Sequence, residues 1–160
     1  MLGLTAILHT HNDALRIARA VESLRPCDEV LVIDHASSDE TERVARAFGA
    51  RVISASEDDA RDYLREARYD WIFCLSPAES LSEGLEASLL EWKLRGELNG
   101  TPLSITFAVQ VVEETEAGWV THIPEPRLGH RVRGGWAKGM PTDAGTISVL
   151  DGHVLRLRMP

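Results

Sequence analysis

Short apolar runs alternate with amphipathic stretches along the first half of the chain. The runs have the length of buried strands and predict four of them, at residues 3–9, 29–33, 51–54 and 71–75. Because helical stretches separate the runs, consecutive strands are joined by crossovers, which are right-handed in parallel sheets. We therefore predict an α/β fold with a Rossmann-like, mostly parallel sheet in the spatial order 3-2-1-4 and helices on both faces.

Helical periodicity marks the segments between and after these strands. Apolar residues recur on one helical face over 13–24, 41–48 and 83–95. The stretch Ser37–Glu40 has the spacing of a capping box, and Ser56–Asp59 resembles another helix start. These segments are long enough to serve as the crossovers of a parallel sheet.

The hydrophobic period changes from helical spacing to strict alternation after Pro102. Residues 105–111 alternate apolar and polar side chains, which predicts a half-exposed antiparallel strand. Glu116–Gly118 predicts a hairpin turn, and short final strands are expected near 146–157. We expect a single domain over 1–160, with an α/β half at 1–96 and a mostly β region at 97–160.

Composition and charge narrow the class of protein. The chain has 160 residues, 44% hydrophobic and 26% charged, as a soluble globular domain has. Its net charge of −8 argues against a nucleic-acid partner, because proteins that bind nucleic acids neutralise the phosphates with basic side chains. The last 40 residues, 121–160, nevertheless hold 6 basic and 3 acidic side chains, so an acidic body carries a mildly basic tail that an anion can approach.

Cysteine usage and hydropathy predict a reduced, cytoplasmic protein. Cys27 and Cys74 lie far apart without a metal-binding spacing, so we expect both to be reduced and buried. The N-terminus lacks the pattern of a secretion signal, and no stretch is long and apolar enough for a transmembrane segment. We therefore place the protein in the cytoplasm.

The loops that follow the four strands are the expected ligand site. In an open parallel sheet, ligands bind beyond the carboxyl ends of the strands. The loops in question are 9–12, 34–39, 54–61 and 76–80.

All four of these loops carry motifs, and the motifs occur in a recognisable order. HTHN at 9–12, VIDHASSDET at 32–41 and EDDARDYLREARYDWIFCLSPAE at 57–79 resemble glycosyltransferase family 2, and EPRLGHRVRGGW at 125–136 is similar to the tail of its short bacterial members. The resemblance implies a GT-A-type fold whose 1–96 half binds a nucleotide-sugar, most simply a UDP-type donor. It also implies a saccharide or lipid-linked acceptor on the 97–160 side.

The resemblance assigns substrate contacts to particular residues. Asp34 is placed to accept N–H groups of a uracil-like base, and Thr10 to hold ribose or phosphate. The other substrate-binding residues that it implies are Asn12, His35, Arg61 and Glu79. Asp39 is expected to cap its helix or to support the turn before it. Taken without the family, Asp34 followed by serines is equally an ordinary strand-to-helix turn.

Several positions depart from the family pattern. The family holds Mg²⁺ or Mn²⁺ with Asp-x-Asp, whereas this chain reads Ser76-Pro77-Ala78 there, followed by Glu79. A single carboxylate is a poor ligand set for a hard cation, so we predict no metal site of this kind. His35 replaces an acidic residue and Asp62 an asparagine. The stretch Ala137–Met140 stands where relatives have a His-Glu pair, so no catalytic base is recognisable.

Three histidines, His9, His11 and His35, are expected to gather at neighbouring strand ends beside Asp34. Imidazoles and a carboxylate suit Zn²⁺. The alternative is that these are polar residues lining a loop-built cleft. A protonated histidine or Arg61 would then offset the charge of a diphosphate.

The chain lacks the motifs of other cofactor-dependent enzymes and of enzymes that use a serine nucleophile. The first strand is not followed by GxGxxG, and the chain contains neither a P-loop nor a GxSxG elbow. Two hypotheses remain. The chain is a glycosyltransferase in which basic residues replace the metal, or it is an inactive relative that serves as a nucleotide-sugar-binding or protein-interaction module.

Overall fold

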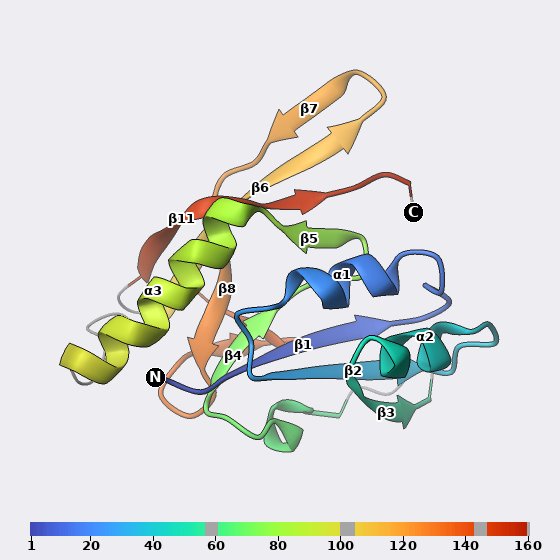
Figure 1. Cartoon of the computed structure of the whole chain (residues 1–160), viewed down its shortest axis with the longest axis horizontal. Coiled ribbons are helices and arrows are strands. Elements are labelled where there is room, and N and C mark those ends of the chain that lie inside the picture. Colours follow the sequence, from blue (N-terminus) through green and yellow to red (C-terminus); the bar gives the residue numbers. More distant parts are fainter. Residues whose placement is uncertain (57–60, 100–104, 143–146, 160) are drawn as a thin grey trace.

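The computed structural model describes residues 1–56, 61–99, 105–142 and 147–159 (Figure 1). The helices are α1 (Ile17–Ser23), α2 (Thr41–Ala47), the 3₁₀ turn η1 (Leu64–Glu66) and α3 (Glu83–Asn99). The strands of the first half are β1 (Leu4–Thr10), β2 (Glu29–His35), β3 (Arg51–Ala55), β4 (Trp71–Cys74) and β5 (Glu79–Leu81). Those of the second half are β6 (Thr106–Thr115), β7 (Gly118–Thr121), β8 (Glu125–His130), β9 (Trp136–Ala137), β10 (Met140–Pro141) and β11 (Ile147–Arg156).

One mixed sheet runs through both halves of the chain. Within the described ranges its strand order is β3-β2-β1-β4-β8-β6-β11-β5, with β7 paired to β6. Strands β3, β2, β1 and β4 are parallel, which confirms the predicted order 3-2-1-4. The C-terminal third extends this sheet from the β4 side, where β8 pairs with β4 and with β6 in antiparallel fashion. Strand β11 is parallel to β6 and antiparallel to the short β5.

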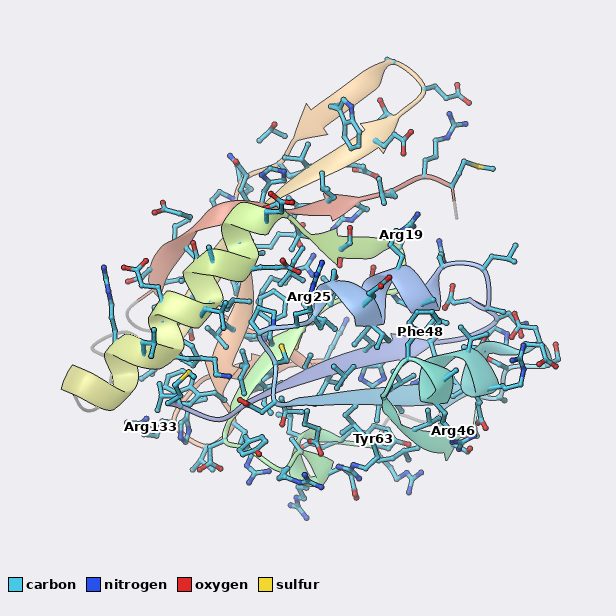
Figure 2. All side chains as sticks on the ribbon, viewed as in Figure 1. Arg19, Arg25, Arg46, Phe48, Tyr63 and Arg133 are labelled. Carbon is cyan, nitrogen blue, oxygen red and sulfur yellow. The ribbon has the colours of Figure 1, made fainter. Side chains whose placement is uncertain are left out.

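The two faces of the sheet are covered differently. Alternate side chains of a strand point to opposite faces. Leu4 and Leu8 of β1 therefore pack in one core with residues of α1 and α3, such as Ile17 and Leu89. Ile7 of β1 packs on the other face, in a core that the η1 region completes with Tyr63, Leu64 and Ala67. Figure 2 shows Tyr63 on the η1 side of the sheet, away from Arg25 next to α1.

Some local predictions need correction. The capping box over Ser37–Glu40 does not form, because α2 begins after Glu40 without a side-chain cap and Ser37 bonds to Asp34 instead. The final residues form one strand, β11, rather than several. The helix start predicted at Ser56–Asp59 falls almost entirely on residues outside the described ranges. The hairpin turn at Glu116–Gly118 is confirmed between β6 and β7.

Because β1, β2 and β4 are parallel, the loops that follow them lie together at the carboxyl ends of these strands. The β6–β7 hairpin extends beyond the body of the sheet, past β11 and β5, as Figure 1 shows. Among the helices of the described segments, none is both long and apolar enough to cross a membrane.

Candidate functional site

A cleft with two adjoining lobes opens where β1 and β4 end. The larger lobe has a volume of about 560 Å³ and the smaller one about 320 Å³. Ile7, His9 and Gly139 line both lobes. The two lobes therefore adjoin at the turn between β9 and β10. The cleft lies where parallel α/β sheets bind their ligands.

The larger lobe combines aromatic surface with basic side chains. Its remaining walls come from the segment before β4 and from the β9–β10 hairpin: Arg61, Asp62, Tyr63, Leu64, Trp136, Ala137 and Lys138. The guanidinium of Arg61 lies 5.2 Å from the centre of the Tyr63 ring and donates to its hydroxyl at 2.9 Å. Trp136 Nε1 donates to the carbonyl of His130 at 3.1 Å, which fixes the indole against the body of the protein. This lobe suits a ligand with a planar ring and an anionic group.

The imidazole rings of His9 and His35 stack and form a hydrogen bond with each other. Their nitrogens, Nδ1 of His9 and Nε2 of His35, are 2.8 Å apart, and the ring centres are 5.1 Å apart. His35 Nδ1 lies 3.0 Å from the carbonyl oxygen of Ser56. A carbonyl only accepts, so neutral His35 carries its proton on Nδ1 and accepts from His9 Nδ1–H. The remaining nitrogen of His9, Nε2, is then unprotonated.

The free nitrogen of His9 faces the division between the lobes. A methyl group placed on Gly139 would lie 3.9 Å from His9 Nε2. Partial burial, followed by the charge of His35, lowers the pKa of His9 from its ordinary value. His9 is therefore neutral near pH 7 and presents a proton acceptor to the cleft.

The loops after β1 and β2 are tied to each other beside the cleft. Asn12, at φ 55°, donates its backbone N–H to Ser37 Oγ at 2.8 Å and accepts from the N–H of Ser38 at 2.8 Å. Thr10 is buried and donates to Asp13 at 2.6 Å. Both residues therefore shape the rim of the site through contacts within the protein.

Asp34 lies at the end of β2 and is 1% exposed. Its two carboxylate oxygens accept from the hydroxyl of Ser37 at 2.5 Å and from the N–H of Ser37 at 3.1 Å. Each oxygen retains a further lone pair. Asp39 accepts from both the N–H and the hydroxyl of Thr41 at the start of α2, as expected of a residue that supports the helix.

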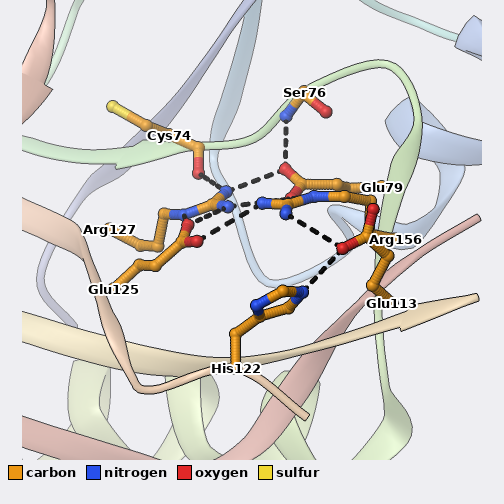
Figure 3. A network of polar contacts seen from close by, with 8 residues as sticks. All are labelled: Cys74, Ser76, Glu79, Glu113, His122, Glu125, Arg127 and Arg156. Carbon is orange, nitrogen blue, oxygen red and sulfur yellow. Dashed lines mark hydrogen bonds and ion pairs between the residues drawn. The ribbon is translucent and has the colours of Figure 1, made fainter. Parts of the chain in front are cut away.

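Glu79 occupies the centre of a buried ion-pair network in the smaller lobe (Figure 3). Arg127 of β8 donates Nη1 and Nη2 to its two oxygens, each at 2.8 Å. Arg156 of β11 adds a contact at 3.1 Å, and the N–H of Ser76 one at 2.9 Å. Glu125 completes the pairing of both arginines.

The electrostatics of the pair follow from these contacts. Burial alone would raise the pKa of Glu79, but the hydrogen bonds and charge of Arg127 outweigh it and hold that pKa below its ordinary range. Burial would likewise lower the pKa of Arg127, and its pairing with Glu79 and Glu125 raises that pKa instead. Both side chains are charged at neutral pH.

These residues do not fit a divalent cation. Ser76 and Ala78 offer no carboxylate, and both oxygens of Glu79 already accept from Arg127. No group of three or more His, Cys, Asp or Glu side chains within the described segments is arranged to hold a metal. His9 and His35 do come together as expected, but through a hydrogen bond between their nitrogens, and His11 Nδ1 lies against the carbonyl of His35 at 2.5 Å. The zinc hypothesis gains no support.

The six predicted contact residues therefore divide into two groups. Arg61 lines the larger lobe and Glu79 the smaller one. Thr10, Asn12, Asp34 and His35 lie beside the cleft, and His35 reaches it only through His9.

Sequence reasoning missed several residues of the cleft. Arg127 and Trp136 lie in the motif at 125–136 and Tyr63 in the motif at 57–79, but the resemblance assigned no ligand contact to them. Arg156 was signalled only by the basic composition of the tail, and Lys138 was noted only as part of a departure from the family pattern.

The two cysteines are free, as expected. Cys74 is buried, as predicted, but Cys27 is only half-buried. Burial raises the pKa of each thiol to about 12, so neither is a thiolate at neutral pH.

Comparison with known sequences identifies relatives of the first half of the chain. Residues 5–77 match the family model described as "Glycosyl transferase family 2". An uncharacterized glycosyltransferase of Rickettsia felis is 34% identical over 94 residues, covering 54% of this chain and 32% of that protein. Another, of Rickettsia prowazekii, is 31% identical over 94 residues, covering 54% and 31%. The chain thus spans about a third of the length of these curated relatives.

Solved structures share the fold at low identity. A crystal structure of a mycobacterial protein matches 72% of this chain and 43% of that one, with a TM-score of 0.52 and 22% identity. Glucosyl-3-phosphoglycerate synthase from Mycobacterium tuberculosis, in complex with Mn²⁺, UDP and phosphoglyceric acid, matches 72% and 45%, with a TM-score of 0.50 and 21% identity. The fold of this chain is thus of the GT-A type.

Proposed function

Because the chain belongs to glycosyl transferase family 2 over residues 5–77, we propose that it binds a nucleotide-sugar donor and transfers the sugar to an acceptor. The donor is a UDP-sugar, and the acceptor is a saccharide or a lipid-linked saccharide. Residues 1–96 supply most of the nucleotide site, to which the β9–β10 hairpin adds Trp136 and Lys138. The rest of the 97–160 region forms the acceptor side. The observation that carries this proposal is the two-lobed cleft at the carboxyl ends of β1 and β4.

The larger lobe is the nucleotide site in this proposal. Ile7, Tyr63 and Trp136 offer apolar and aromatic surface for a base, and Arg61 and Lys138 offer positive charge for a diphosphate. Asp34, Thr10 and Asn12 stand at the rim, where the lone pairs of Asp34 can accept from the base. His35 positions His9.

His9 is the proton acceptor of the transfer step. The acceptor hydroxyl oxygen forms a bond to the anomeric carbon, the bond from that carbon to the diphosphate oxygen breaks, and its electron pair leaves with the nucleoside diphosphate. The hydroxyl proton passes to His9 Nε2, the one ring nitrogen that the His9–His35 pair leaves unprotonated.

The second candidate is a binding module without catalysis. Two observations favour it: Ser76 and Ala78 at the Asp-x-Asp position offer no carboxylate, and Glu79 beside them is paired internally with Arg127. Nucleotide binding is common to both candidates when the module binds nucleotide-sugars, so turnover separates them.

The experiment is a calorimetric titration with uridine, UDP and GDP, followed by a turnover assay with a panel of UDP-sugars and saccharide acceptors. UDP should bind, and Arg61→Ala together with Lys138→Ala should weaken that binding about tenfold. Arg65→Ala is the matched control, because Arg65 is exposed on η1 outside the cleft. Binding without turnover of any donor favours the module. If no nucleotide binds, the proposal fails.

A further inference from the structure

Three N–H groups from two arginines converge on the carboxylate of Glu125 in the smaller lobe (Figure 3). Arg127 donates to Oε2 through Nε at 3.2 Å and through Nη2 at 2.8 Å. Arg156 donates to Oε1 through Nη2 at 3.4 Å. Two guanidinium groups that share one carboxylate in this way resemble an oxyanion-binding fork.

Arg127 keeps its orientation without Glu125. Arg127 is 3% exposed. Its other two contacts do not depend on Glu125: they are to the carboxylate of Glu79 and, at 3.1 Å, to the carbonyl of Cys74. A guanidinium has five N–H donors. When Glu125 moves away, Nε–H and one Nη2–H are left aimed into the lobe from a fixed frame.

Glu125 is the member of the network that can leave. The Glu125 side chain is 36% exposed, whereas that of Glu79 is 1% exposed. Arg156, at 30% exposure, also lies at the open side of the cluster. Departure of Glu125 returns an already part-exposed carboxylate to water and changes the charge of the Glu79, Glu113, Glu125, Arg127 and Arg156 set from −1 to 0.

The geometry points to a phosphate subsite. We propose that Arg127 and Arg156 bind a phosphate group of a substrate, and that Glu125 holds its place in the free protein. The subsite deepens the proposed function and rests on it for the identity of the substrate. Because both lobes share His9 and Gly139, a phosphate bound here lies next to the nucleotide lobe. Its source is the diphosphate of the donor or a phosphate carried by the acceptor.

The first experiment uses inorganic phosphate alone as the probe. It is titrated into the ¹⁵N-labelled protein while the Nε–H signals of arginine are followed by NMR. Glu125→Gln removes the internal competitor and should tighten phosphate binding about tenfold. Arg156→Gln should weaken it about tenfold or abolish it. The matched controls are Glu116→Gln and Arg158→Gln, an exposed ion pair with N–O distance 2.6 Å outside the cleft, and they should change nothing.

Opposite signs make this test robust against loss of structure. A damaged fold cannot produce the tighter binding that Glu125→Gln predicts, so this variant remains informative even when Arg156→Gln is poorly folded. The proposal is overturned when Glu125→Gln binds phosphate no more tightly than the parent, or when a folded Arg156→Gln binds it equally well.

The second experiment separates the two sources of phosphate. When the diphosphate of the donor is the source, Arg156→Gln weakens UDP binding about tenfold and leaves uridine binding unchanged, and saturating UDP blocks inorganic phosphate. When the acceptor is the source, Arg156→Gln leaves UDP unchanged and inorganic phosphate binds in the presence of UDP. Either result supports the subsite. Phosphate binding with the predicted responses, in a protein that binds neither UDP nor uridine, would keep the subsite and refute the proposed function.

Discussion

The guanidinium of Arg127 and the carboxylate of Glu79 face each other in a buried bidentate pair, with two N–O distances of 2.8 Å. They come from β8 and β5, which are not neighbours in the sheet. Glu79 follows directly on the loop where the family pattern has its metal carboxylates. In this chain the guanidinium of Arg127 therefore pairs with the Glu79 carboxylate, which a divalent metal would need as a ligand.

Breaking this pair should destabilise the protein strongly. Removal of one partner leaves an uncompensated buried charge, so Glu79→Gln and Arg127→Met should each lower the free energy of unfolding by about 3–5 kcal/mol. The double variant should lose less than the sum, as measured by urea denaturation. Glu40→Gln is the control, because Glu40 and Arg43 form an exposed pair that contributes at most about 1 kcal/mol. Additive losses would show that the two side chains do not act together.

Stability should fall as the pH drops below about 6.5. The pKa of His9 is lowered in the folded state, chiefly by burial. Between that pKa and the ordinary value the unfolded chain binds more protons, so stability is full above this window and is lost as the pH falls through it. Melting temperatures at about pH 7.5 and 5.5 measure the loss. His9→Gln should show a smaller loss than the parent, and an equal loss would contradict the role assigned to His9.

Gly152 should tolerate no side chain. Its φ is 89°, and a Cβ there would lie 2.3 Å from the backbone nitrogen of Leu85 in α3. Gly118 has a similar φ of 116° but open space around it, and so isolates the cost of the backbone conformation. Gly152→Ala should therefore cost about 1–3 kcal/mol more than Gly118→Ala in chemical denaturation. Equal costs would place α3 farther from β11 than the structure has it.

Asp34 should contribute to nucleotide affinity through its remaining lone pairs. Asp34→Ala should weaken UDP binding by about 1–3 kcal/mol if a buried acceptor to the base is lost. Asp39→Ala is the control, since Asp39 lies farther along the loop from the end of β2 and supports the start of α2. Calorimetry on folded variants measures both. An unchanged affinity in Asp34→Ala would remove Asp34 from the site.

The parallel half of the fold was predictable because its signals are local. Each apolar run of β1, β2 and β4 fits a strand buried on both faces, and the helical spacing between them dictates the crossovers. Strand β5 escaped prediction because its three residues, Glu79–Leu81, carry no pattern and are held by pairing with β11 more than 70 residues away.

The site was predictable only in part, for the same reason. The gathering of His9 and His35 follows from the parallel pairing of β1 with β2, which the sequence indicated. The pairing of Glu79 with Arg127 joins residues 48 positions apart through a C-terminal sheet extension whose order no local pattern determines. The basic tail signalled cations without showing that two of them would reach this cleft.

In the proposed function, this cleft binds a nucleoside diphosphate with its own cations and without a divalent metal. Calorimetric titration of UDP in EDTA and then in excess Mn²⁺ tests it most directly. The double variant Ser76→Asp/Ala78→Asp serves as a comparison in which metal dependence should appear if Pro77 lets both carboxylates face the cleft. We expect equal UDP affinity of the unmodified protein in EDTA and in Mn²⁺. Binding that appears only when Mn²⁺ is added would contradict this expectation.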